Sequence, residues 1–201
     1  MIITVASFKG GVAKTVTAVH LAAYLQSLGE TVLIDGDPNR SATGWSKRGE
    51  LPFKTVDERQ AAKHISTSKF DHIVIDTQAR PNREDLEALV AGCDLLVIPC
   101  IPDALSLDAL MLTINELKAI GSDRDRYKIL LTITPPKPSK DAAEARATLI
   151  EAGLPLFKTS IPRLSAFQKA ALNGVLVYQC RDSRAGIAWA SYKSVGKEII
   201  K

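Results

Sequence analysis

The chain has 201 residues, 46% of them hydrophobic, and a net charge of only +4. This length and composition predict a single globular domain over residues 1–201, with enough apolar side chains for a sizeable core. They exclude a membrane-spanning helix, because no run approaches about 18 consecutive apolar residues, and the first residues lack the features of a signal peptide.

Short apolar runs alternate with helical patterns along the chain. Strands are expected at residues 2–6, 31–34, 72–75, 95–99 and 129–134, with a shorter one near 156–159. The central runs are apolar on consecutive residues, which is typical of parallel strands covered on both faces. The alternation predicts an α/β fold, a doubly wound and mostly parallel sheet with helices on both faces.

The first helix is expected at residues 14–28, where Ala18, Leu21, Leu25 and Leu28 share one apolar stripe. Gly29 is expected to end it. The other helices are expected at 40–48, 82–91, 104–120, 140–152, 164–173 and 183–199. A proline-rich stretch at 135–140 follows a strand end. It either borders a ligand beyond the carboxyl ends of the strands or forms a plain stiff turn, and the sequence leaves both readings open.

The first strand leads directly into Lys-Gly-Gly-Val-Ala-Lys-Thr at residues 9–15, a phosphate-binding loop (P-loop) that opens a helix. The small residues let successive backbone N–H groups close around phosphate oxygens, and the helix presents its positive end to them. The cradle residues are Gly10, Gly11, Val12 and Ala13. Lys14 would reach the β- and γ-phosphates, and the Thr15 hydroxyl would ligate Mg²⁺.

A second lysine, Lys9, opens this loop. The common G-x-x-x-x-G-K-[ST] pattern has no fixed residue at that position, and its first glycine falls on Phe8. The three cysteines show no C-x-x-C spacing, so they are expected to be buried, reduced thiols. His20 is expected to be a packed or surface histidine and not a ligand.

Two predicted strands end in aspartates beside this loop. Asp35 and Asp37 follow the strand at 31–34, and Asp76 follows the strand at 72–75. Mg²⁺ prefers oxygen ligands and keeps part of its hydration shell, so we expect Asp76 to hold it through water, with Thr15 and Asp37 beside the ion.

The roles of Asp35 and Asp37 stay open at this point. Asp37 is the better candidate for orienting the attacking water, and Asp35 is expected closer to the metal shell. The alternative is that one of the two aspartates only caps the helix that starts near residue 40. Capping suits Asp37 better, because Asp37 is nearer to that helix.

Positive charge gathers at the end of the chain, where residues 157–201 carry eight lysines and arginines against two acids. A basic end on a near-neutral body favours a polyanion-binding face, and a solvated helix surface is the alternative. Lys193, Lys197 and Lys201 form one stripe, with Val195 and Ile199 roughly opposite. We expect this helix to dock on the body with its lysines outward.

These motifs together resemble the deviant Walker ATPases of the ParA/MinD family. The most specific of them are Lys-Gly-Gly-x-x-Lys-Thr at 9–15, Asp-Gly-Asp-Pro at 35–38 and Ile-Val-Ile-Asp at 73–76. The resemblance continues through 97–99, 105–107 and 161–163 and so covers essentially the whole chain. Within the family, the chain is most similar to the small ParA-type partition ATPases and to the McdA type, which spaces carboxysomes.

The resemblance implies a cytoplasmic, nucleoid-associated enzyme that hydrolyses ATP to ADP and phosphate with Mg²⁺. Such a protein closes into a homodimer with ATP sandwiched between the subunits and binds nucleoid DNA without sequence preference. It positions or segregates a plasmid, a chromosome or a carboxysome. A cargo-bound adaptor protein of ParB or McdB type stimulates hydrolysis.

The resemblance also implies residue roles. Lys9 matches the signature lysine, which touches the phosphates bound by the other subunit. Lys14 and Thr15 match the lysine and the Mg²⁺ ligand of the same subunit, Asp37 the water-positioning aspartate and Asp76 the Walker B aspartate. Nucleotide contacts are expected along the loop and also at Val16 and Pro162. The basic end matches the DNA-binding surface in general position, with contacts expected at Arg163, Lys169, Arg184, Lys193 and Lys197.

Two departures from the family pattern affect the loop. Ala13 stands where most relatives have glycine, so its Cβ would crowd the cradle. Val16 replaces a threonine whose hydroxyl would reach the α-phosphate. Both changes are expected to weaken nucleotide affinity or slow turnover without abolishing ATP binding.

Two other functions fit the same scaffold. An ATP-dependent ligase or kinase of the dethiobiotin-synthetase type is one, and the basic C-terminal end argues against it. A MinD-like membrane-associated regulator is the other, and the lysine stripe of the last helix argues against membrane binding.

The larger ParA proteins carry a helix-turn-helix region before the first strand. Because this chain starts at that strand, operator-specific repression is not expected.

Overall fold

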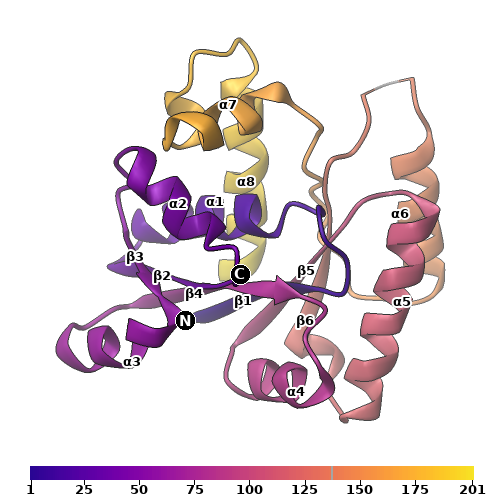
Figure 1. Ribbon diagram of the computed structural model, residues 1–201. Coiled ribbons are helices and arrows are strands. Elements are labelled where there is room, and N and C mark those ends of the chain that lie inside the picture. Colours follow the sequence, from indigo (N-terminus) through magenta and orange to yellow (C-terminus); the bar gives the residue numbers. More distant parts are fainter. Residues whose placement is uncertain (137) are drawn as a thin grey trace.

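The computed structural model describes residues 1–136 and 138–201. Six strands form one sheet in the order β3-β2-β4-β1-β5-β6, and all neighbouring strands are parallel (Figure 1). The strands are β1 (Ile2–Ser7), β2 (Thr31–Gly36), β3 (Lys54–Asp57), β4 (His72–Ala79), β5 (Leu95–Cys100) and β6 (Tyr127–Leu131). The predicted doubly wound sheet is confirmed, and its carboxyl ends all point to one edge.

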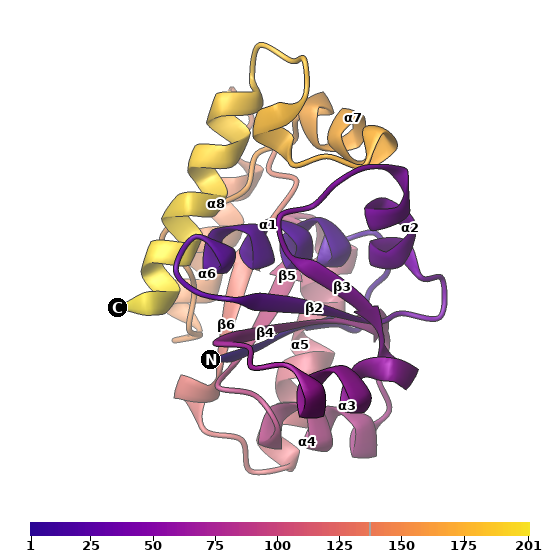
Figure 2. The same cartoon turned by 90° about the vertical axis from the view of Figure 1, so that its left-hand side faces the viewer.

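Helices cover both faces of the sheet (Figure 2). One face is covered by α1 (Lys14–Gln26), α2 (Ser41–Arg48), α7 (Ser165–Asn173) and α8 (Ala185–Ile200). The other is covered by α3 (Glu58–Thr67), α4 (Arg83–Ala91), α5 (Ala104–Ala119) and α6 (Asp141–Glu151). Two short 3₁₀ helices, η1 (Arg124–Arg126) and η2 (Val177–Gln179), lie in connections. Successive strand side chains enter opposite cores: Val97 faces α1, and its neighbours Leu96 and Ile98 face α4 and α5.

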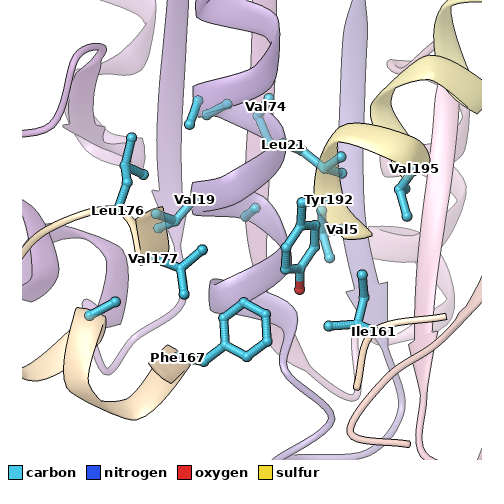
Figure 3. Close-up of a cluster of buried hydrophobic side chains, with 14 of the residues drawn as sticks. Val5, Val19, Leu21, Val74, Ile161, Phe167, Leu176, Val177, Tyr192 and Val195 are labelled. Carbon is cyan, nitrogen blue, oxygen red and sulfur yellow. The ribbon is translucent and has the colours of Figure 1, made fainter. Parts of the chain in front are cut away.

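The core between α1 and α8 fixes the helix that follows the phosphate loop. Tyr192 of α8 is fully buried, and its hydroxyl lies 3.0 Å from Thr17 Oγ1 of α1. Figure 3 shows Tyr192 among packed side chains from α1, α7, α8 and the sheet. A Cβ on Gly196 would overlap the Tyr24 ring, so glycine allows α8 to approach α1 closely.

His20 of α1 belongs to this core, as expected of a packed histidine. Its Nδ1–H donates to the Val16 carbonyl at 2.7 Å, and its Nε2 accepts from the Val177 N–H at 3.2 Å. Burial lowers the pKa of His20 to about 4, so the ring is neutral at physiological pH. The first helix is thereby bonded to η2, and the His20 ring also stacks on the Tyr192 ring of α8.

The structure corrects several element boundaries. Neither β3 nor α3 was predicted from the sequence, because these elements bury only Val56 and Ala61. The strand expected at 129–134 ends at Leu131, and residues 156–159 contribute only an isolated bridge from Leu156 to Ile129. The first helix ends at Gln26, which leaves Leu28 exposed. All three cysteines are free and buried, as expected.

Candidate nucleotide-binding site

The predicted phosphate loop connects β1 to α1 at the carboxyl edge of the sheet. Gly11 has φ 77° and Ala13 has φ 67°, so the loop is built from left-handed turns that favour glycine. A Cβ on Gly10 or Gly11 would meet no atom within 4 Å, which means that both glycines border open space. No side chain of the described residues caps the start of α1, and its first N–H groups can bind an anion.

Ala13 adopts the conformation that a glycine would adopt without strain. The departure at Ala13, which was predicted to crowd the cradle, therefore strains the backbone. An alanine in the left-handed region costs about 1 kcal/mol of stability. Val16, the second departure, lines the cavity described below.

Lys14 and Asp76 form the charged centre of the site. Lys14 is buried, and burial lowers the pKa of its ammonium group while the carboxylates of Asp76 and Asp37 oppose the shift. Asp76 is fully buried within β4, and neither of its carboxylate oxygens has a hydrogen-bond partner among the described residues. Burial raises the pKa of Asp76 to about 7, and the nearby Thr15 hydroxyl opposes the rise.

An unpartnered buried carboxylate beside a lysine and a threonine fits a magnesium site. Thr15 would ligate the ion, and Asp76 and Asp37 would hold its water shell. The described residues contain no group of three or more His, Cys, Asp or Glu side chains able to hold a metal alone. The remaining ligands would therefore have to be phosphate oxygens and water.

In the structure, Asp35 and not Asp37 caps the helix α2. Asp35 is fully buried, and its Oδ2 accepts from the Thr43 N–H in the first turn of α2 at 2.7 Å, while Oδ1 accepts from the Asp37 N–H. The expectation that capping suits Asp37 better was wrong, because the chain bends at residues 36–40 and brings the α2 start back over Asp35. Both Asp35 oxygens thereby accept backbone N–H bonds, and the expectation that Asp35 lies closer to the metal shell stays a prediction.

Asp37 instead faces the cavity. Its Oδ1 accepts from the Asn39 backbone and side-chain nitrogens at 2.8 and 2.9 Å. Its other carboxylate oxygen accepts no hydrogen bond from the described residues and is available to water. The water-positioning role of Asp37 stays a prediction.

A cavity of about 580 Å³ runs from the phosphate loop to α7. It brings together most of the residues predicted to bind nucleotide or metal: Gly10, Gly11, Ala13, Lys14, Thr15, Val16, Asp37 and Pro162. Arg163, predicted to contact DNA, also lines it. Val12 and Asp76 are buried behind this lining. None of the described residues of the 135–140 stretch lines it. The volume is large enough for a nucleotide-sized ligand.

Further lining residues were missed from the sequence. Asn39 and Ser41 enter from the α2 start, Ile133 from the end of β6, and Phe167 and Gln168 from α7. Ile133 has φ 50°, which is strained for a β-branched residue. The carboxyl-edge rule for α/β sheets predicts a residue after β6 at this place. Nothing in the sequence indicates the contribution of α7.

Lys9 lies at the mouth of the loop and not in the cavity. Its Nζ donates to Ser106 Oγ at 2.7 Å and to Asp103 Oδ1 at 3.2 Å. Asp103 caps α5 by accepting from the Ser106 N–H and also accepts from the Ser106 hydroxyl. Two lysines five residues apart are thus held differently: Lys14 points into its own site, and Lys9 is bound to α5.

The basic residues predicted at the C-terminal end differ in availability. Lys193 and Lys197 are exposed on α8, while Val195 is buried and Ile199 packs on the core, as predicted. Lys169 is bound to Asp182 at 2.8 Å, so its charge is largely compensated. Arg184 is exposed just before α8, and Arg163 is exposed at the cavity rim.

The profile of the CobQ/CobB/MinD/ParA nucleotide binding domain matches residues 3–177 of this chain. The chain belongs to this family. It is 34% identical over 203 residues to "Maintenance of carboxysome distribution protein A" of Gloeobacter kilaueensis, covering 98% of this chain and 93% of the relative. The protein of the same name from Halothiobacillus neapolitanus is 26% identical over 186 residues, covering 88% of this chain and 86% of the relative.

Solved structures agree on the fold of this ParA/MinD-type domain. A putative plasmid partition protein from Borrelia burgdorferi, bound to AMPPNP, superposes with a TM-score of 0.75 at 17% identity, covering 99% of this chain and 98% of that one. The profile match and the 34% identical relative confirm the family resemblance inferred from the sequence. Within the described ranges, the ParA/MinD-type domain has no helix with the length and hydropathy needed to cross a bilayer.

Proposed function

We propose that this protein is a ParA-type positioning ATPase. It binds Mg²⁺ and ATP in the cavity, closes into an ATP-sandwich homodimer, binds nucleoid DNA without sequence preference and hydrolyses ATP when a cargo-bound adaptor stimulates it. Mg²⁺, when bound, neutralises charge on the β- and γ-phosphates. Lys14 holds those phosphates, and Asp37 orients a water molecule in line with the γ-phosphorus.

The observation that carries the proposal is the placement of Lys9. A lysine of the phosphate loop that served its own site would point into the cavity, as Lys14 does. The Lys9 ammonium is held outside it by Asp103 and Ser106, with 28% of the side chain exposed. This placement leaves Lys9 available to the phosphates of a second subunit. A cation that arrives only on assembly makes hydrolysis depend on the dimer, as an arginine finger does.

The packing of α1 against α8 supports a link between nucleotide and DNA. The same helix that presents its amino end to the phosphates carries Thr17 and His20, which bond to Tyr192 and to η2. A change at the phosphate loop therefore acts on a rigid unit that includes the basic helix. Closing a homodimer would place two such helices on one assembly, and neutralising several DNA phosphates at once makes binding strong and salt-dependent.

The nature of the cargo rests on the relatives. Two proteins named for carboxysome distribution match this chain over most of its length. We therefore favour a carboxysome over a plasmid or chromosome as cargo, and an adaptor of McdB type over one of ParB type. Nucleoid association follows from the proposed DNA binding.

Retention on DNA tests this function. The purified protein is passed over immobilised non-specific DNA with ATP, with ADP and without nucleotide, in a salt series. The proposal predicts strong retention with ATP alone and a steep loss as salt rises. Equal retention in all three states refutes the nucleotide switch. Sedimentation with anionic liposomes and ATP serves as the comparison, because a MinD-like regulator would bind the liposomes and not the DNA.

A further inference from the structure

Arg80 is a strained arginine at the end of the strand that carries Asp76. It directly follows β4 and has φ 56°, a left-handed backbone conformation that residues other than glycine and asparagine rarely adopt. Its N–H donates to the Ser7 carbonyl at 3.1 Å, where the register between β1 and β4 shifts. The chain bends here so that Arg80 lies beside the start of the phosphate loop.

Among the residues that the structure describes, the Arg80 side chain makes one polar contact. Its Nε–H donates to the carbonyl of Phe8 at 3.2 Å, and Phe8 directly precedes Lys9. Within residues 1–136 and 138–201, the guanidinium group has no carboxylate partner. Arg80 is exposed and strained, and among the described residues its side chain binds only the Phe8 carbonyl. Its role therefore lies in the part of the loop that this carbonyl holds in place.

The first turn of the phosphate loop is therefore attached to two neighbouring elements. Phe8 is tied through its carbonyl to the end of β4, and Lys9 is tied through its ammonium to α5. When Lys9 leaves Asp103 and Ser106, the Arg80 contact with the Phe8 carbonyl and the bond from the Lys9 N–H to Ser7 Oγ at 3.2 Å still fix the direction from which its side chain starts. Asp76 lies in the same strand, four residues before Arg80.

We propose that Arg80 is a positioning residue for Lys9, which sets the start of the Lys9 side chain through the Nε–H bond to the Phe8 carbonyl. This inference rests on the proposed function, in which Lys9 reaches the nucleotide of a second subunit. Arg80 itself touches neither nucleotide nor metal ion. Its effect appears in dimer formation and turnover and leaves nucleotide binding by the single subunit intact.

Two substitutions of equal length separate this role from a role of the charge. In Arg80→Gln, the amide nitrogen stands at the same number of bonds from Cα as Nε of arginine, so the donor stays and the charge is removed. In Arg80→Met, a chain of the same length has no donor. Both variants keep a side chain in the left-handed conformation, so backbone strain is the same in each.

The experiment measures three quantities for the wild type and both variants. Affinity for a fluorescent ATP analogue reports binding by the subunit. Sedimentation velocity with a non-hydrolysable ATP analogue reports dimer formation, and phosphate release reports turnover. We expect Arg80→Met to weaken the dimer at least about tenfold with analogue affinity within twofold of wild type, and Arg80→Gln to stay within about threefold in all three.

A second comparison tests whether Arg80 acts through Lys9. The double variant Lys9→Ala with Arg80→Met is expected to hydrolyse ATP at the same residual rate as Lys9→Ala alone, because an effect carried by Lys9 disappears with it. Thermal unfolding shows whether each variant is folded.

The outcomes are distinct. Wild-type behaviour of Arg80→Met overturns the inference, and so does a loss in Arg80→Gln as large as that in Arg80→Met, since it would assign the effect to the charge. A further loss in the double variant overturns it as well. If the wild type stays monomeric with the analogue, the proposed function fails and the inference fails with it.

Discussion

The phosphate loop and the basic helix α8 both present lysines, yet the two regions hold them in opposite ways. In the loop, Lys14 is buried against Asp76, and Lys9 is bound by Asp103 and Ser106. On α8, Lys193 and Lys197 stand in solvent without an ion pair among the described residues. The difference indicates that the loop uses charge at fixed positions, while α8 offers charge to a ligand that does not require one geometry.

Removing a lysine from the loop is expected to give the largest effect. Lys14→Ala leaves the buried Asp76 without its cation and takes a positive charge from the phosphates, at a cost of about 3–5 kcal/mol in nucleotide binding. Isothermal titration with ATP and Mg²⁺ measures this loss. Lys193→Ala is the matched control and is expected to bind ATP like the wild type. Equal affinities for the two variants would erase the distinction between the regions.

The buried carboxylate gives the next effect, a pH dependence of stability in the metal-free protein. The pKa of Asp76 is raised from 3.8 to about 7. Between these values the folded protein keeps a proton that the unfolded chain has lost. The stability from this group is full below about pH 4 and is lost as the pH rises through about 7.

Asp76→Asn removes this dependence. At pH 8 the variant is expected to exceed the wild type in free energy of unfolding by up to about 4 kcal/mol, and at pH 4 the two should be close. Urea unfolding at both pH values with a metal chelator measures the difference. Asp108→Asn, at an exposed position of α5, serves as the control. A difference that does not grow with pH would contradict the account of Asp76.

The lysines of α8 are expected to act additively and through salt. Lys193→Ala with Lys197→Ala should weaken ATP-dependent DNA binding by about tenfold and lower the slope of log affinity against log salt by about 2. Lys169→Ala is the comparison, because its ion pair with Asp182 already compensates the charge. We expect a smaller change there. A change in salt slope as large as for one α8 lysine would show that the ion pair opens on DNA.

The smallest expected effect concerns the backbone of the loop. Ala13→Gly removes the strain of a left-handed alanine and should raise the free energy of unfolding by about 0.5–1 kcal/mol. Ala147→Gly, at an exposed position inside α6, should lower it by about 1 kcal/mol. Thermal unfolding of both variants checks the opposite signs. A loss of stability in Ala13→Gly would mean that the left-handed turn costs nothing here.

The two regions also differ in what the sequence predicted. Lys14, Thr15 and Asp76 were assigned from local patterns, because a strand, a small-residue loop and a helix fix their own geometry. The capping role of Asp35 and the contact of Lys9 with Asp103 were not. The first depends on how the chain bends before α2, and the second joins residues 94 positions apart.

Elements that bury few side chains were not predicted from the sequence. The strand β3 buries Val56 alone and α3 buries Ala61 alone, so neither shows a hydrophobic period. For the basic end, composition predicted a charged face and the lysine stripe placed α8 correctly. The ion pair of Lys169 with Asp182 depends on the approach of α7 to the loop before α8, which no local pattern records.

The most direct test of the central claim is the mass of Lys9→Ala in solution. Wild type, Lys9→Ala and the surface control Lys118→Ala are compared by sedimentation velocity with ATP and Mg²⁺, after titration with a fluorescent analogue shows the affinity of each subunit. The account predicts that all three bind the analogue with similar affinity and that only Lys9→Ala stays monomeric. A Lys9→Ala protein that dimerises and hydrolyses ATP like the wild type would contradict it.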